Sequence, residues 1–552
     1  MLLPHLRWLG LICLLGVAAS GCRIPELCCP EAGPALPADY RGVSTPDNMA
    51  LIGIQEFFTD DGLAELLTVR LAQNQELKIR NQEIWIASNE IMARRGAYLP
   101  FLSLGARGGF DRTSRFTPLG AAEDQLTYPG GGIFPDPLPR VGLGANAFWE
   151  IDIWRRLRNA RDAAMQRYIE AIERRNYLVT QLVAETAENY YELLALDRRL
   201  EFLEQTIEIQ NRSLDFARTQ KATGTGTELG VQRFLAEVRK NESQRFIFQQ
   251  QIIEAENKIN FLVGRYPQPV ERGKWDFIKL DSQTLSVGVP PQLLLNRRDV
   301  RAAERELAAS GLDIAVARAN FYPRLTLFAG VGYEAFSPRY LFDPGAFVAN
   351  AAGEMVGPVI NRLAIRAEYM NANARQLQAA YNYQRTLLNA FTEVVNNLNK
   401  VQNYKDSVAL KQEQVAALDQ SVTVATDLLQ KAQPGVEYMD VLFAQRDLLE
   451  GRIVLIETKQ QQLVGIIRTY QALGGGYLVT TGGTEFASLF CQPAEILSAE
   501  EASASALEEI VPNSGDELMA PANGQPSPDP STSKESSRRR EGKSEGVEAA
   551  SG

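Results

Sequence analysis

An internal repeat is the feature of this 552-residue chain that most constrains its fold. Residues 321–333 read FYPRLTLFAGVGY and repeat the pattern of residues 98–110, which read YLPFLSLGARGGF. In both copies apolar side chains alternate with small or polar ones, as in a half-buried β-strand. Each copy lies between long polar stretches with helical periodicity. An internal duplication organises the rest of a fold, so we predict two copies of a helix–strand–loop–strand–helix unit.

The segments around the repeat predict long helices. The stretch 155–221 contains neither Pro nor Gly, and its Leu193, Leu196, Leu200, Leu203 and Ile207 recur at steps of three and four residues. This spacing is typical of a coiled-coil seam, and a helix of that length extends about 100 Å. Helices are predicted at 63–95, 155–221, 228–262, 293–319, 363–432 and 437–473, and strands at 98–115, 141–153, 321–333 and 347–360.

Composition divides the chain around the two units. Pro-rich residues precede the first unit and separate it from the second, and Ser, Glu, Pro and Ala dominate the end of the chain. Segments of that last kind bury too little apolar surface to fold. The predicted division is a lipoprotein signal peptide at 1–21, a lipid anchor and tether at 22–61, a first unit at 62–263, a linker at 264–292, a second unit at 293–476 and a disordered acidic tail at 477–552.

The N-terminus predicts export from the cytoplasm. Arg7 precedes an apolar run from residue 9 to residue 18, and small residues then lead to Cys22. A run of this length fits a secretory signal rather than a membrane span, which needs about 20 apolar residues. The cysteine after small residues resembles a bacterial lipoprotein signal, which implies that Cys22 is acylated, with palmitate as an expected acyl chain. Ordinary cleavage upstream of a structural cysteine is the alternative.

Charge, histidine and cysteine content exclude several classes of protein. Residues 478–552 hold 13 Asp/Glu and 5 Lys/Arg, so they carry −8 of the net charge of −10, and the body has no basic tract for nucleic acid. The one histidine is His5, within the predicted signal. No histidine-based triad or zinc site can therefore form in the mature chain. Cys28, Cys29 and Cys491 make neither a disulfide framework nor a metal motif.

The four predicted strands cannot close a barrel alone, because transmembrane barrels have about eight strands or more. Open strand edges in lipid leave backbone groups without hydrogen bonds, so several chains must share one barrel if these strands enter a membrane. Aromatic residues beside the strands fit membrane-interface anchors, although each taken singly also fits an ordinary core. The interface candidates are Tyr98, Trp149, Trp154, Tyr322 and Tyr333. The helices fit either a tube or a solid coiled-coil stalk.

Residues from about 60 to 475 resemble the outer membrane factors, the TolC-like channels of tripartite efflux and type I secretion. The duplicated hairpins, the strand entries at residues 98–100 and 321–323, and the motif WEIDIWRRLR at 149–158 carry this resemblance. The last motif and Cys22 are most similar to the NodT-type lipoprotein branch. The resemblance implies a mainly α fold with a membrane β part: a homotrimer whose 12-stranded β-barrel continues into a periplasmic α-barrel of long coiled-coil hairpins.

The same resemblance implies partners, a location and functional residues. The partners are a periplasmic adaptor, an inner-membrane exporter driven by protons and outer-membrane lipid; no cofactor, metal or enzymatic activity is implied. Asp440 takes the first of two positions that line the closed periplasmic aperture in TolC-like proteins, and Phe443 takes the second. The alternative is that Asp440 is a solvated charge near a helix N-terminus. The expected adaptor-docking tips are Gly224, Thr225, Gly226, Thr227, Gly435, Val436 and Glu437.

The predicted function is therefore a passive outer-membrane exit duct of an efflux system. A type I protein secretion duct has the same architecture, and a structural coiled-coil envelope lipoprotein without a pore shares the helices. The periplasmic adaptor itself is less consistent, since adaptors have one hairpin and this chain has two. Sequence does not name the exported substrate.

Overall fold

The computed structural model describes residues 24–273, 277–279, 286–358, 362–431 and 438–477. The predicted signal peptide, Cys22, the second tip at Gly435, Val436 and Glu437, and the acidic tail beyond residue 477 lie outside these residues. The elements are, in order, η1 (Met49–Leu51), α2 (Ile54–Phe57), α3 (Asp61–Gln73), α4 (Gln75–Tyr98), β1 (Phe101–Asp111), α5 (Pro118–Glu123), β2 (Leu138–Ile151), α6 (Arg156–Ala222), α7 (Glu228–Val263), η2 (Phe277–Lys279), η3 (Pro290–Gln292), α8 (Leu293–Asn296), α9 (Arg298–Ala319), β3 (Arg324–Ala335), η4 (Pro338–Tyr340), η5 (Pro344–Ala346), β4 (Phe347–Val356), α10 (Leu363–Gln430) and α11 (Tyr438–Ala472).

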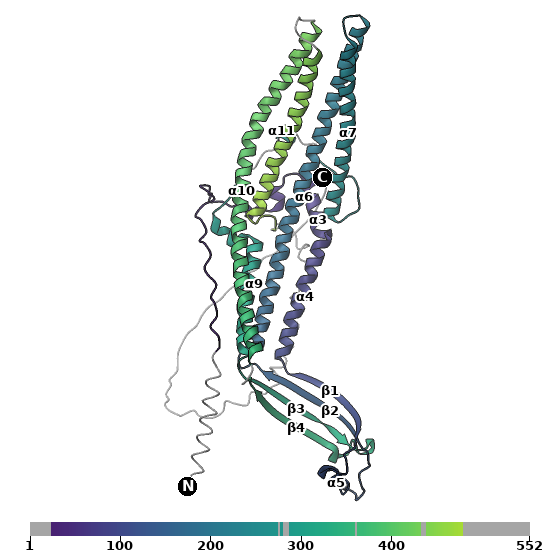
Figure 1. Cartoon of the computed structure of the whole chain (residues 1–552), viewed down its shortest axis with the longest axis vertical. Helices are drawn as coiled ribbons and strands as arrows, with labels where there is room; N and C mark the ends of the chain where they lie inside the picture. Colours follow the sequence, from purple (N-terminus) through teal and green to yellow (C-terminus); the bar gives the residue numbers. More distant parts are fainter. Residues whose placement is uncertain (1–23, 274–276, 280–285, 359–361, 432–437, 478–552) are drawn as a thin grey trace, which may run out of the picture. The chain divides into compact units, whose positions relative to one another are not determined.

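The four strands form one antiparallel sheet in the order β1-β2-β3-β4 (Figure 1). Strands β1 and β2 come from the first unit and β3 and β4 from the second, so the two units join through the β2–β3 pairing. The register places Ala147 opposite Leu102 on one side and opposite Ala329 on the other. Within the described residues, β1 and β4 each have a partner on one side only.

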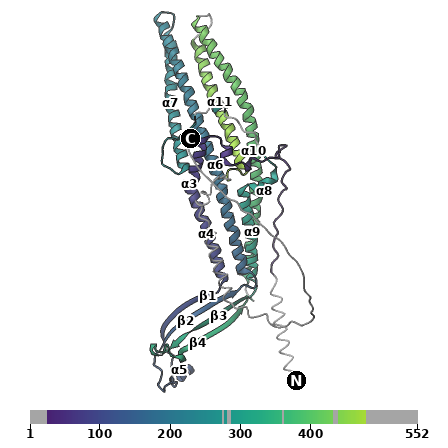
Figure 2. The ribbon, with the colours of Figure 1, turned by 180° about the vertical axis from the view of Figure 1, so that it is seen from behind.

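Two long helical hairpins contain the longest helices of the chain. Helix α6 has 67 residues and pairs with α7, and α10 has 68 residues and pairs with α11. Figures 1 and 2 show the two hairpins side by side, with α11 in contact with α6. Four of the five predicted seam residues, Leu193, Leu196, Leu203 and Ile207, are in the core, and Leu200 is partly buried against it. Among the described residues, no helix has the length and apolar character needed to cross a membrane.

Two predicted helices are each interrupted once. The helix expected at 63–95 breaks at Asn74, and the one expected at 293–319 breaks at Arg297. Asn74 caps α4 by accepting a hydrogen bond from the Leu77 N–H (3.1 Å), and its side chain donates to the Leu262 carbonyl at the end of α7 (2.9 Å). The break at Asn74 therefore combines a local helix cap with a long-range contact.

Arg297 makes the corresponding contact in the second unit. Its guanidinium donates to the Ala472 carbonyl at the end of α11 (3.1 Å). Helix α7 ends before Gly264 and α11 ends before Gly474, and both glycines have positive φ (83° and 96°), a conformation that glycine adopts without strain. We call the Asn74 contact with the end of α7 the first joint and the Arg297 contact with the end of α11 the second joint.

The main core surrounds these joints and includes the N-terminal segment. Met49, Ile54 and Phe57 are buried there, and the Phe57 ring stacks on Tyr470 (centroids 4.0 Å apart, 9° between planes). The Tyr470 hydroxyl also donates to the Ile52 carbonyl (2.7 Å). Part of the segment predicted as a tether is thus an integral part of the fold.

Candidate functional site

The two faces of the sheet differ in chemistry. Side chains of residues directly opposite each other in neighbouring strands project to the same face. The register therefore collects the apolar or small side chains Leu102, Leu104, Ala106, Phe110, Val141, Leu143, Ala145, Ala147, Trp149, Leu325, Leu327, Ala329, Val331, Tyr333, Phe347, Ala349, Ala351 and Met355 on one face. We call this the apolar face, and it carries no charged side chain among these paired positions.

The opposite face, which we call the polar face, carries the charged and amide groups. Arg107 on β1 crosses above Gly142 to pair with Glu334 on β3 (2.5 Å). The side chains of Asn146 and Asn350 converge above Gly330. A sheet with these two faces can separate lipid from water, because a charge in the middle of a lipid-facing surface is costly.

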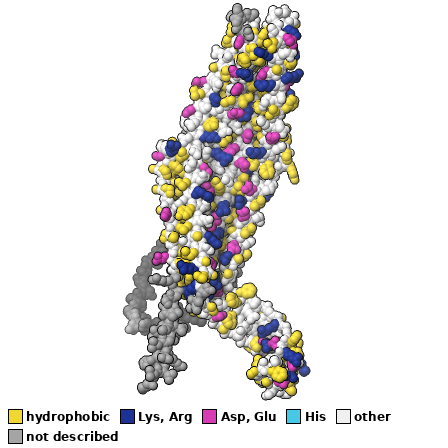
Figure 3. Space-filling view, viewed as in Figure 1, with side chains coloured by type: hydrophobic (Ala, Val, Ile, Leu, Met, Phe, Trp, Pro, Cys, Tyr) yellow, Lys and Arg dark blue, Asp and Glu magenta, His cyan; other side chains and the backbone are white. Residues whose placement is uncertain are grey.

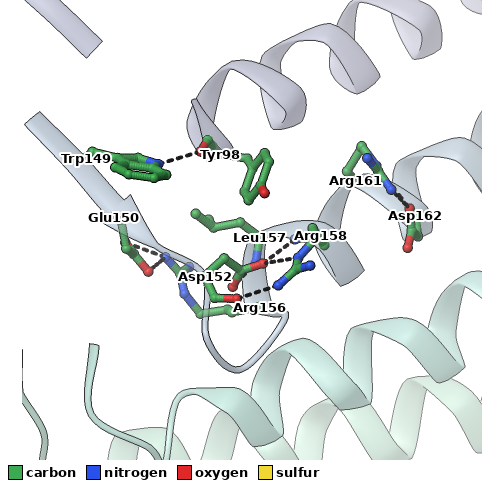
Figure 4. Close-up of polar contacts among 9 residues, drawn as sticks. All are labelled: Tyr98, Trp149, Glu150, Asp152, Arg156, Leu157, Arg158, Arg161 and Asp162. Carbon is green, nitrogen blue, oxygen red and sulfur yellow. Dashed lines mark hydrogen bonds and ion pairs between the residues drawn. The ribbon is translucent and has the colours of Figure 1, made fainter. Parts of the chain in front are cut away.

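A compact turn connects β2 to α6 (Figure 4). Asp152 is buried, and its carboxylate accepts hydrogen bonds from the backbone N–H groups of Leu157 (3.1 Å) and Arg158 (2.9 Å). The Arg158 guanidinium donates back to the Asp152 carbonyl (2.7 Å). Arg155, with a positive φ of 57°, reverses the chain between them. The motif at 149–158 is therefore a locked strand-to-helix corner, in which Asp152 satisfies free N–H groups of the first helical turn.

Four of the five predicted interface aromatics lie at this end of the sheet. The indole of Trp149 donates to the Tyr98 carbonyl (3.1 Å), as Figure 4 shows. The indole of Trp154 donates to the Pro323 carbonyl (2.7 Å), and its ring stacks on Tyr322 (4.6 Å, 21°). Each indole thus fixes the polypeptide where a helix gives way to a strand. Their role at a membrane interface remains a prediction.

The fifth aromatic, Tyr333, lies near the other end of β3. Its ring is next to Phe347 (5.9 Å) and Phe342 (6.1 Å). Beyond this end, Tyr128 and Phe134 from the β1–β2 connection pack against Phe336. The structure therefore divides the predicted aromatics between both ends of the sheet.

The first hairpin tip is a five-residue turn closed by hydrogen bonds. The Gln220 carbonyl accepts from the N–H groups of Thr225 and Gly226 (both 3.0 Å) and from the Thr225 hydroxyl (3.1 Å). Thr227 caps α7 by accepting from the Gly230 N–H (3.3 Å). A Cβ on Gly226 would lie 2.9 Å from the backbone nitrogen of Lys221, so this position needs glycine. The four predicted tip residues 224–227 therefore form one ordered turn.

An ion pair adds to this tip. Lys221 at the end of α6 pairs with Glu228 at the start of α7, and the hydrogen bond from Lys221 lowers the pKa of the Glu228 carboxyl. Helix α7 therefore begins with a carboxylate, which also suits the positive end of its helix dipole.

The predicted gate residues lie in the first turns of α11. Asp440 and Phe443 are both exposed, and as residues three positions apart they share a helix face. The Arg446 guanidinium lies 5.0 Å from the centre of the Phe443 ring, a cation–π contact that sequence analysis did not anticipate. The structure therefore brings the two predicted gate residues together on one exposed face, while their role in gating remains a prediction.

Tyr438 and Met439 connect this turn to the first hairpin. The Tyr438 ring meets Phe234 edge to face (6.3 Å, 84°) and covers Gly230 of α7. The Arg233 guanidinium contacts the Met439 sulfur (2.6 Å). Sequence analysis missed both contacts, because the four residues come from chain segments about 200 positions apart. The start of α11 is therefore held by side chains of α7.

A polar layer lies further along the contact between the hairpins. Within the first hairpin, buried Asn241 donates to the Gln210 side-chain oxygen (2.8 Å). Across to the second hairpin, buried Gln445 donates to the Ser213 hydroxyl (3.1 Å). Among the described residues, the Gln210 Nε2 and Gln445 Oε1 atoms have no hydrogen-bond partner. We call these four residues the amide layer.

A charged groove runs across α4, α6, α9 and α10. Its lining includes Arg80, Glu170, Arg174, Glu306 and Arg385. Burial raises the pKa of the Glu170 carboxyl, Arg174 lowers it and Glu306 raises it further. Figure 3 shows side chains of both charges scattered over the viewed face of the helices, so no single sign dominates there.

Comparison with known proteins supplies a context for this geometry. A family model described as outer membrane efflux protein matches residues 66–265 and 289–475. The cation efflux system protein CusC of Escherichia coli K12 is 26% identical over 434 residues, which cover 79% of this chain and 91% of CusC. The toluene efflux pump outer membrane protein TtgI of Pseudomonas putida is 28% identical over 446 residues, 80% of this chain and 90% of TtgI.

A solved structure shares the fold. The outer membrane channel MtrE of Neisseria gonorrhoeae superposes with a TM-score of 0.71 at 21% identity, covering 84% of this chain and all of MtrE. At that identity the likeness concerns the fold: strands and long helices are arranged alike in both chains.

Proposed function

This chain belongs to the outer membrane efflux protein family, and from that premise we propose that it is the outer-membrane channel of a tripartite efflux system. It acts as a passive homotrimeric duct, which receives cargo from an inner-membrane exporter through a periplasmic adaptor. Energy comes from the exporter, with a proton gradient as the expected source. The proposal includes no enzymatic step and no cofactor.

The observation that carries this proposal is a sheet with one apolar face and two unpaired edges. Backbone N–H and C=O groups left without partners in lipid cost several kcal/mol each. Strands β1 and β4 have such edges within the described residues. Pairing β1 of one copy with β4 of the next removes them all, and three copies give a closed barrel of twelve strands.

Exposed apolar side chains on the outer helices support lateral association. Ile86 on α4 and Phe246 and Phe261 on α7 are exposed, as are Leu388 and Leu410 on α10. Exposed apolar groups in such numbers are typical of surfaces that other chains cover. Side-by-side packing of three copies would bury them and extend the barrel as a tube of helices.

The tips and the N-terminus fit the other parts of the proposal. Three copies place three Asp440 carboxylates and three Phe443 rings around the axis, which would form a charged and apolar constriction. The ordered turn of residues 224–227 would offer small side chains to the adaptor hairpins, and residues 435–437, outside the described residues, are the second candidate docking segment. Ile24 and Leu27 pack against the buried cluster that contains Phe321 at the strand entry, so an acyl group on Cys22 would begin close to the membrane boundary.

Adjacent alanines in the middle of β4 provide the test. Ala351 is on the apolar face and Ala352 on the polar face. Lysine near the bilayer midplane costs about 2–4 kcal/mol on a lipid-facing surface. Ala351→Lys should therefore reduce the yield of trimers in the outer membrane, whereas Ala352→Lys should assemble and lower the cation selectivity of currents in planar bilayers.

Absence of conductance from a well-assembled wild-type trimer would refute the duct and favour a structural coiled-coil lipoprotein. Equal behaviour of the two alanine variants would refute the assignment of the faces. The two relatives named above belong to a cation efflux system and a toluene efflux pump, so membership of the family does not identify the cargo of this chain.

A further inference from the structure

Three phenylalanines lie in register on the polar face of the sheet. Phe101 on β1 pairs with Phe148 on β2, and Phe148 pairs with Phe328 on β3. Their side chains are 67%, 53% and 39% exposed within the chain. Apolar side chains of this size and exposure are unexpected on the face that carries the charges, which suggests that the three rings have a function there.

Polar rows on both sides fix the environment of these rings. On the loop side, the adjacent row contains Ser103, Asn146 and Asn350. On the helix side, the next row contains Glu150, Thr326 and Glu354. Lipid would leave these carboxylates and amides without solvation. The phenylalanines between them must therefore face the same aqueous space.

The row lies at the end of the sheet nearest the helices. Strand β1 begins at Phe101, and β2 ends three residues after Phe148. Neighbouring strands are about 4.8 Å apart, so the three rings cover a strip about 10 Å wide. In a closed trimer, three such strips would surround the lumen where the barrel meets the helices.

We propose that Phe101, Phe148 and Phe328 form an aromatic band that binds the aromatic part of small organic cargo during passage. This inference rests on the proposed duct and names a cargo class for it. Aromatic rings attract other rings in offset or edge-to-face arrangements, beyond the effect of burial alone. A strip of three rings matches the width of a one- or two-ring organic molecule. The polar rows beside it keep the lumen wet, which favours brief rather than permanent binding.

The three phenylalanines could either stabilise the sheet alone or bind cargo, and the two roles predict different behaviour of solutes in the lumen. If the rings only stabilised the sheet, their contacts with one another and with the backbone would be enough, and cargo would not sense them. If they bind cargo, an aromatic solute in the lumen should dwell longer than an aliphatic solute of equal charge. The comparison isolates the rings from electrostatic effects of the lumen.

The test uses the full-length trimer in planar bilayers, with tetraphenylphosphonium or tetrapropylammonium added on the loop side. From that side the probe reaches the band without crossing the helical tips. The variant carries Phe101→Leu, Phe148→Leu and Phe328→Leu together, which keeps apolar bulk and removes the rings. The matched control is Phe110→Leu, because Phe110 is on β1 and 74% exposed but belongs to the apolar face.

We expect the triple variant to shorten the tetraphenylphosphonium dwell time about tenfold, with little change for tetrapropylammonium. Phe110→Leu should match the wild type. If the triple variant does not assemble, Phe148→Leu alone should shorten the dwell time about two- to threefold. Equal dwell times in wild type and ring-free variants would overturn the band, whereas loss of all current in the wild type would instead refute the duct.

Discussion

Replacing Arg297 with methionine should destabilise the second joint more than any comparable change at the first. The Arg297 side chain is 2% exposed and forms ion pairs with Asp299 (2.6 Å) and Glu393 (2.7 Å) in addition to its hydrogen bond to the Ala472 carbonyl. Burial disfavours its charge, yet the two carboxylates raise the pKa of the guanidinium above its ordinary value. The charge is therefore retained at every pH at which the protein folds.

The magnitude follows from the exposure of each partner. The Ala472 carbonyl would lose a charged donor in a buried setting, at about 1.5–3 kcal/mol. Glu393 is 39% exposed, so solvent screens its pair and limits it to about 0–1 kcal/mol. Asp299 keeps a hydrogen bond from the Val300 N–H at the start of α9, which compensates part of its loss. Arg297→Met should therefore cost about 3 kcal/mol in total.

Asn74→Ala is the matched control at the first joint. It removes one helix cap, worth about 1 kcal/mol, and one neutral hydrogen bond to the Leu262 carbonyl, worth about 1 kcal/mol. Unfolding of the detergent-solubilised protein by guanidinium chloride, followed by circular dichroism at 222 nm, gives the free energy of unfolding of both variants. A free energy of unfolding for Arg297→Met equal to the wild type, or above that of Asn74→Ala, would refute this account of the joints.

Three further predictions concern the tip, the groove and the sheet. Tyr438→Ala removes the ring contact with Phe234, which is worth about 1 kcal/mol. We expect the variant to raise the open probability of the channel about fivefold in single-channel records. An unchanged open probability would show that this contact does not hold the tip closed. Because burial raises the pKa of Glu170, its ionisation weakens folding as the pH rises through the raised value. Glu170→Gln should therefore raise the melting temperature at pH 8 and leave it unchanged near pH 4, below the ordinary glutamate pKa, and a gain of equal size at both pH values would contradict this. A Cβ on Gly144 would lie 2.9 Å from the Val331 carbonyl oxygen, so Gly144→Leu should prevent the β2–β3 register and the heat-resistant trimer on gels; normal trimers would argue against the register.

Local patterns were sufficient to predict the strands and the long helices. Leu102 and Leu104 alternate with Ser103 and Arg107, and the structure places the two pairs on opposite faces as this alternation requires. The 67-residue α6 likewise follows from an uninterrupted run of helix-forming residues. In both cases the signal is the periodicity of neighbouring residues, which sequence displays directly.

The joints and the tip contacts have no comparable local signal. Asn74 is a favourable N-cap residue and caps α4 locally, but its contact with the Leu262 carbonyl, 188 positions away, has no local signal. Arg297 resembles any solvated arginine until its burial against α11 is known. The gate residues Asp440 and Phe443 were proposed from family resemblance, whereas the Tyr438 contact with Phe234 depends on how two distant hairpins pack.

The two hairpins differ where the duplication would make them alike. In the first hairpin, Gln210 and Asn241 form a hydrogen-bonded amide pair. The corresponding positions of the second hairpin hold Leu418 and Gly451. The leucine packs on the glycine so closely that a Cβ on Gly451 would lie 2.9 Å from the Leu418 Cδ1 atom. At this level the second hairpin is therefore joined by an apolar contact, beside an ion pair between Asp419 of α10 and Arg452 of α11 (2.8 Å). Its contact with α6, in contrast, includes Gln445 with a buried oxygen lacking a partner among the described residues, at a cost of about 1–3 kcal/mol. The weaker contact thus lies between the hairpins rather than within the second one, which explains why a single side chain such as Tyr438 is expected to influence the position of the whole α10–α11 tip.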